Sequence, residues 1–180
     1  LPEIFKTLQP EEDQERLVQI VGQALDMALK SLVANRRLEG DGLCQDIRNK
    51  LQTLDKYRVG LLGLASQVVA TYQEKLTKRI QELTSGVDID PNRLATEVAI
   101  FADKSDITEE TVRIESHLKQ FQQIFDSNEP IGRRMDFLIQ ELNREINTVG
   151  SKASDINIAQ LVINFKAELE KIREQIQNIE

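Results

Sequence analysis

The chain has 180 residues, of which 40% are hydrophobic and 4% aromatic, and its formal net charge is −7. This composition excludes a disordered chain, and the acidic balance excludes a general polyanion-binding protein, so a nucleic acid would need a local basic surface or a metal ion. Cys44 is the only cysteine, and the sequence has neither a signal peptide nor an apolar run near the roughly 20 residues of a membrane span, so we expect a cytoplasmic protein without disulfides.

Two long helices are predicted in the first half of the chain. Pro10 and the three acidic residues after it suit a first helical turn, and apolar residues recur at helical spacing from Leu17 to Leu32. The sequence Gly40-Asp41-Gly42 predicts a break. A second helix is predicted over residues 43–83, because apolar residues recur there in steps of three or four. A helix of about 60 Å cannot bury such a stripe alone and needs a partner helix.

The second half predicts four shorter helices. Gly86 is suited to end the long helix. Later helix boundaries are marked by Asp90-Pro91, by Asp106 three residues before Glu109, by the turn Glu129–Gly132, and by Asp155 or Asn157 as the last cap. We therefore expect an all-α fold of long antiparallel helices. Residues 1–90 would form a coiled-coil-like helical arm or hairpin, and residues 91–180 a compact helical core.

The stretch from Glu97 to Asn147 concentrates the chemistry of the sequence. It holds 11 of the 30 acidic residues, 6 of the 23 basic residues and the only histidine. On the helix predicted after Asp106, four polar residues spaced four, three and four apart follow one border of the apolar stripe: Asp106, Glu110, Arg113 and His117. Such a set could bind a divalent metal or share acid–base work. The same spacing also describes a ladder of structural ion pairs, which is the commoner arrangement.

On the helix predicted over residues 133–149, polar residues fall on three sides of the apolar stripe. These sets are Arg134, Glu141 and Glu145; Asp136, Asn143 and Asn147; and Arg133, Phe137 and Arg144. The third set points away from the core, where a phenylalanine between two arginines could stack on a nucleic-acid base while the arginines take phosphates. It could equally form a subunit contact, because Phe and Arg are enriched in such contacts.

The acidic balance of this stretch bears on the type of reaction. Its net charge of −5 repels phosphate unless metal ions bridge the two, so RNA cleavage would fit a metal-assisted mechanism. One cysteine and one histidine cannot supply the four ligands of a structural zinc site. The sequence also contains no glycine-rich phosphate loop and no nucleophile elbow.

Several of these segments resemble the bacterial YicC-like proteins. They are Glu97–Ala99, Ala102–Glu110 with Arg113, Ser116 and His117, Gly132–Phe137, Gln140–Glu145, Asn147–Lys152 and the C-terminal Lys166–Glu180; Arg37–Gly40 also fits. The resemblance implies a cytoplasmic, divalent-metal-dependent endoribonuclease that acts on single-stranded RNA and forms a homo-oligomer, a hexamer. It also implies a strand-rich N-terminal domain, absent here, so we interpret the chain as the helical C-terminal portion.

We assign candidate roles from motif position and from the helix faces. The candidate ligands of Mn²⁺ or Mg²⁺ are Glu97, Asp103, Asp106, Glu109, Glu110, Asp136, Glu141 and Glu145. The candidate catalytic groups are His117, for proton transfer, with Asp106 and Glu110. The candidate RNA contacts are Arg113, Arg133, Arg134, Phe137, Arg144 and Lys152.

Two alternatives to a nuclease remain open at this point. The chain could be a non-catalytic oligomeric adaptor that presents RNA to another nuclease, or a structural scaffold that only holds an oligomer together. Under all three readings the chain associates with further copies of itself. A nuclease or an adaptor would bind single-stranded RNA, and we expect neither DNA nor a membrane as a partner.

Overall fold

The computed structural model describes residues 13–84, 90–125 and 132–177, and within these ranges the chain is helical and has no β-strand. The helices are α1 (Gln14–Thr84), α2 (Pro91–Ser105), α3 (Thr108–Ile124), α4 (Gly132–Lys152) and α5 (Ile156–Ile176). The all-α prediction is confirmed. The helix start expected at Pro10, the helix end at Gly86 and the turn residues Glu129–Ile131 lie outside the described residues.

The break expected at Gly40–Gly42 is absent, because α1 runs through these residues as one helix. A glycine inside a helix costs only about 1 kcal/mol relative to alanine, and the flanking segments are rich in good helix formers. The chain divides nevertheless into two compact units at this point, residues 1–42 and 43–180.

The helical part of the first unit exposes an apolar surface. Leu17, Ile20 and Leu25 are each more than half exposed. An 18-residue window of α1 near the N-terminus has a mean hydropathy of 1.3 and no buried residue, so α1 passes as a membrane span by length and composition alone. Signal sequences and buried helices of soluble proteins pass the same test. Asp26 and Lys30, which form an ion pair at 2.7 Å, would each cost about 3 kcal/mol inside a bilayer.

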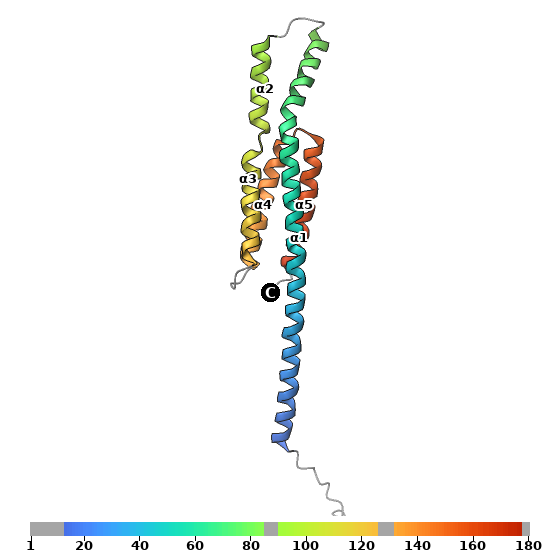
Figure 1. The fold of residues 1–180 in the computed structure, drawn as a ribbon, viewed down its shortest axis with the longest axis vertical. Helices are drawn as coiled ribbons and strands as arrows, with labels where there is room; N and C mark the ends of the chain where they lie inside the picture. The colour runs from blue at the N-terminus through green and yellow to red at the C-terminus, as the bar shows by residue number, and fades with distance from the viewer. Residues whose placement is uncertain (1–12, 85–89, 126–131, 178–180) are drawn as a thin grey trace, which may run out of the picture. The chain divides into compact units, whose positions relative to one another are not determined.

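The second unit is built around one hydrophobic core. In Figure 1, α4 runs antiparallel to α3 and to α5, and these three helices lie beside the later part of α1. The core residues come from all four helices, and they include Ile47, Leu51, Leu54, Leu61, Ile114, Phe121, Met135, Leu142, Ile146, Ile158, Phe165 and Ile172. This arrangement supplies the partner helices that the apolar stripe of α1 requires.

Small residues and long polar side chains join these helices. A Cβ atom at Gly60 would lie 3.2 Å from Leu161 Cδ1 of α5, so the small glycine allows α1 and α5 to pack closely at this point. Arg58 Nη1 lies 3.3 Å from Glu115 Oε2 of α3, and Lys50 Nζ lies 3.8 Å from Glu168 Oε1 of α5. The seam between α1 and its neighbours is therefore tied by ion pairs at its borders.

Side-chain caps fix the starts of α2 and α5. The Asp90 carboxylate accepts a hydrogen bond from the Asn92 backbone N–H at 2.9 Å, as the Asp90-Pro91 pair predicts. Asp155, and not Asn157, caps α5 by accepting from the backbone N–H groups of Asn157 and Ile158. The Phe101 ring of α2 stacks on Tyr72 of α1 with 3.7 Å between ring centroids, which places α2 against the last part of α1.

A candidate metal centre between α3 and α4

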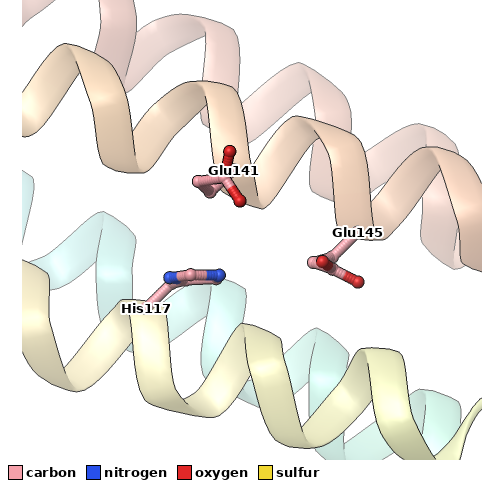
Figure 2. Close-up of side chains that lie close together, drawn as sticks. All are labelled: His117, Glu141 and Glu145. Carbon is pink, nitrogen blue, oxygen red and sulfur yellow. The ribbon is translucent and has the colours of Figure 1, made fainter.

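Three ligating side chains meet across the seam between α3 and α4. His117 comes from α3, and Glu141 and Glu145 come from α4, where a spacing of four places them one turn apart on the same side. One ligand atom from each of the three lies within 4.8 Å of the others. Figure 2 shows the imidazole of His117 facing both carboxylates.

The surroundings of these groups make the site unusual for a helix surface. Glu145 is only 4% exposed, whereas His117 and Glu141 are half-buried. His117 Nδ1 is buried and has no hydrogen-bond partner among the described residues. Burying a carboxylate or an imidazole nitrogen without a partner is costly, so a cation bound here would compensate that cost. Two carboxylates and one imidazole suit a divalent ion such as Mg²⁺ or Mn²⁺.

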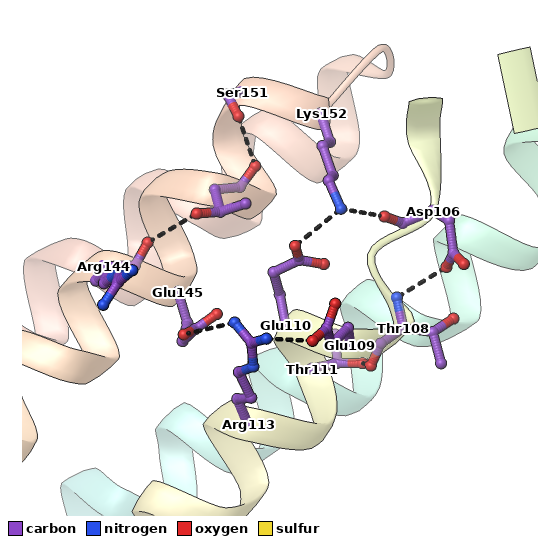
Figure 3. Close-up of polar contacts among 11 residues, drawn as sticks. Asp106, Thr108, Glu109, Glu110, Thr111, Arg113, Arg144, Glu145, Ser151 and Lys152 are labelled. Carbon is purple, nitrogen blue, oxygen red and sulfur yellow. Dashed lines mark hydrogen bonds and ion pairs between the residues drawn. The ribbon is translucent and has the colours of Figure 1, made fainter. Parts of the chain in front are cut away.

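Arg113 links this cluster to the next turn of α3. Its Nη1 lies 3.5 Å from Glu145 Oε1, and its Nη2 pairs with Glu109 on the same helix (Figure 3). The pKa of Arg113 is raised, first by the charge of Glu109 and also by that of Glu145. The arginine therefore holds Glu145 in place and supplies positive charge beside the cluster.

Glu110 and Lys152 form a second, separate contact across the same seam. Lys152 Nζ lies 2.8 Å from Glu110 Oε1 and also donates to the backbone carbonyl of Asp106 at 2.8 Å (Figure 3). Glu110 is 5% exposed, and its Oε2 has no hydrogen-bond partner among the described residues. This ion pair ties the end of α4 to the junction between α2 and α3.

Asp106 stabilises the start of α3. Its carboxylate accepts a hydrogen bond from the Thr108 backbone N–H at 2.9 Å. Hydrogen bonds from Thr108 lower the pKa of Asp106, and the charge of Lys152 lowers it further. Because the charged form is favoured in the folded state, Asp106 stabilises the fold while it is ionised.

The lowered pKa of Asp106 predicts that the protein loses free energy of unfolding in acid. Hydrogen bonds from Gln175 and from Lys119 likewise lower the pKa values of Asp46 and Glu115. A lowered folded-state pKa gives stability that is present above the unfolded pKa of about 4 and is lost as the pH falls through the folded value. Urea midpoints should therefore stay level between about pH 5 and 8 and fall below about pH 4.

The urea midpoint of the Asp106→Asn variant should fall less steeply as the pH is lowered, because asparagine keeps the hydrogen-bond acceptor but has no charge to titrate. If this variant and the unmodified chain have the same pH dependence between pH 5 and 3, Asp106 does not contribute in this way.

The other candidate ligands do not belong to this cluster, because they are exposed or contact other residues. Glu97 and Asp103 are exposed on α2, and Asp136 is exposed on α4, where it accepts a hydrogen bond from Gln140 at 3.1 Å. Glu109 is paired with Arg113. These assignments stay predictions, and so do the catalytic roles of Asp106 and Glu110. The structure brings together Glu141, Glu145 and His117 from the predicted set.

The candidate RNA contacts fall into two groups. Arg113 and Lys152 pair with carboxylates on the seam, and Arg144 is exposed on α4. The others line a groove of about 460 Å³, called here the Phe137 groove, whose lining comprises Gln120, Gln123, Ile124, Arg133, Arg134, Phe137 and Leu138. Sequence reasoning missed Gln120 and Gln123, although Gln120 follows His117 by three residues, which is about one turn of α3.

Comparison with known proteins agrees with the resemblance seen in the motifs. The family described as "Endoribonuclease YicC-like, C-terminal" matches residues 62–180. A protein of Clostridioides difficile named "Probable endoribonuclease YicC" is 51% identical over 180 residues, which cover 99% of this chain and 61% of that protein. One of the same name from Haemophilus influenzae is 34% identical over 173 residues, or 94% and 58%. The chain spans about three fifths of the length of these relatives. It belongs to the YicC-like endoribonuclease family.

Proposed function

We propose that the chain carries the catalytic centre of a divalent-metal-dependent endoribonuclease that cuts single-stranded RNA. The observation that supports this proposal best is the meeting of His117, Glu141 and Glu145 across the α3–α4 seam. The family name and the names of both relatives support RNA as the substrate class. Two carboxylates and a buried imidazole nitrogen without a partner among the described residues fit a metal ion better than a purely cationic grip on phosphate.

Each residue of the seam has a distinct task in this proposal. His117, Glu141 and Glu145 would hold Mn²⁺ or Mg²⁺, which supplies Lewis-acid stabilisation of the charge that develops on the phosphate. Arg113 keeps Glu145 oriented and adds positive charge where a phosphate would approach. Lys152 fixes the spacing of the two helices through Glu110. Metal ligands act in their deprotonated forms, so protons compete with the metal ion for these side chains.

Self-association and a cytoplasmic setting complete the proposal. The exposed apolar surface of the helical segment before Gly42 supports a protein partner, and the resemblance implies further copies of the same protein, six in all. Sedimentation of the protein gives this number directly. Cys44 as the only cysteine supports a reducing compartment.

The test is cleavage of a labelled single-stranded RNA by this chain and, in parallel, by a full-length relative. We expect cutting with Mn²⁺ or Mg²⁺ and none with EDTA, and titration calorimetry should show binding of Mn²⁺ without any RNA. Cutting by the full-length protein alone would mean that residues outside this chain supply part of the active site. Cutting in EDTA at the same rate would overturn the metal-dependent mechanism, and RNA binding without cutting by either protein would favour the adaptor.

A further inference from the structure

The Phe137 groove combines an aromatic face, an apolar floor and a polar rim. Phe137 is 58% exposed, whereas Ile124 and Leu138, which line the same groove, are almost fully buried. The rim carries the side-chain amides of Gln120 and Gln123, which offer both donors and acceptors of hydrogen bonds. A volume of about 460 Å³ lies within the range of pockets for small ligands.

The Phe137 groove and the candidate metal centre are neighbours along the seam between α3 and α4. On α4, Phe137 precedes Glu141 by four residues, which is about 6 Å along the helix axis. On the antiparallel α3, Gln120 follows His117 by three residues. Both helices therefore pass from the groove to the cluster within one turn. A strand of RNA that placed a phosphate at the cluster would bring the next nucleotide over the groove.

Two arginines line the groove at this end of the seam. Arg133 and Arg134 lie in the first turn of α4 and line the groove. The positive end of the α4 dipole adds to their attraction for a phosphate. This local charge contrasts with the acidic balance of the chain as a whole, which is −7.

We infer that the Phe137 groove binds the base of the nucleotide next to the scissile phosphate, an inference that rests on the proposed nuclease function. The base stacks on the Phe137 ring, as bases of single-stranded nucleic acids do on exposed aromatic side chains. Gln120 and Gln123 face the edge of the base, and Arg133 faces its phosphate. Phe137 is thus a positioning residue that sets which bond of the RNA reaches the metal centre.

The first experiment measures RNA binding in EDTA, where no metal-dependent cleavage occurs. The probes are a fluorescent oligouridylate and an abasic ribose-phosphate oligomer of the same length. Phe137→Ala should weaken binding of oligouridylate about tenfold and leave binding of the abasic oligomer unchanged, because only the first probe has bases to stack. Phe137→Trp should keep the affinity. Ile163→Ala is the matched control, because Ile163 is also 58% exposed but lies on α5.

Equal effects of Phe137→Ala on both probes would overturn the inference. So would an unchanged affinity for RNA combined with a changed sedimentation mass, which would make Phe137 a contact between protein subunits. Because this binding assay does not depend on cleavage, its failure is distinguishable from failure of the proposed nuclease activity.

A second experiment locates the base relative to the cut. An oligouridylate with a single abasic nucleotide is cleaved in Mn²⁺, and the products are resolved at single-nucleotide length. The unmodified protein should cut the bond next to the abasic nucleotide about tenfold less than the other bonds. Phe137→Ala should cut all bonds evenly. Equal cutting at every bond by the unmodified protein would contradict a base-binding site beside the scissile phosphate.

Discussion

Replacement of Glu141 and Glu145 together by glutamine should lower metal-dependent RNA cleavage by about 100-fold or more. Loss of a group that only supports a metal ligand already costs about 10- to 100-fold, and these two residues are the carboxylate members of the candidate centre. Glutamine keeps the shape of each side chain and removes the charge that a divalent ion requires. Initial rates on a labelled single-stranded RNA, measured over a range of Mn²⁺ concentrations, test this expectation.

Glu170→Gln is the matched control for this double variant. Glu170 is exposed on α5 and lies outside the cluster, so its replacement should leave the rate within about twofold. Calorimetry gives a second measurement, because the double variant should no longer bind Mn²⁺, whereas Glu170→Gln should bind it normally. Normal Mn²⁺ binding by the double variant would show that the metal lies elsewhere.

Replacement of Lys152 by methionine should destabilise the second unit by about 3 kcal/mol. The change leaves the carboxylate of Glu110, which is 5% exposed, buried without its cation, and removal of one partner from a buried pair typically costs 3–5 kcal/mol. The lower end applies because the Lys152 side chain is itself 30% exposed and water can reach the pair. Denaturant unfolding followed by circular dichroism measures the change.

The double variant Glu110→Gln with Lys152→Met separates the ion pair from the packing around it. Neutral glutamine is far less costly to bury than an unpaired carboxylate, so the double variant should regain most of the lost stability. A double variant as unstable as Lys152→Met alone would mean that the contact of Lys152 with the Asp106 carbonyl, and not the ion pair, holds the two helices together.

Much of the fold follows from patterns that are local in sequence. Apolar stripes at helical spacing located the helices that the structure describes, and short polar residues such as Asp90 and Asp155 marked where two of them begin. The break predicted from the glycines at 40 and 42 was wrong. A helix can tolerate the loss of stability caused by glycine where the neighbouring residues favour the helix. Local propensity therefore located the helices better than it located a break within one.

The sequence predicted the residues of the candidate site on each helix, but it did not predict how the two helices bring them together. Helix periodicity placed His117 on one border of α3, and Glu141 and Glu145 on one border of α4, but it did not show that these borders face each other. The pairing depends on the antiparallel register of α3 and α4, which the core residues of both helices set together. The same register pairs Glu110 with Lys152 and Arg113 with Glu145, and neither pair follows from the spacing within one helix.

The position of α1 in the chain has a consequence for synthesis on the ribosome. Its core residues Ile47 to Leu61 precede their partners on α5, such as Phe165, by about 100 residues. At translation rates of about 5–20 residues per second, this apolar stripe waits roughly 5–20 s before its last partner helix exists. By contrast, α3, α4 and α5 follow one another and can pack as each emerges. The nascent α1 is therefore the segment for which a chaperone would be most useful.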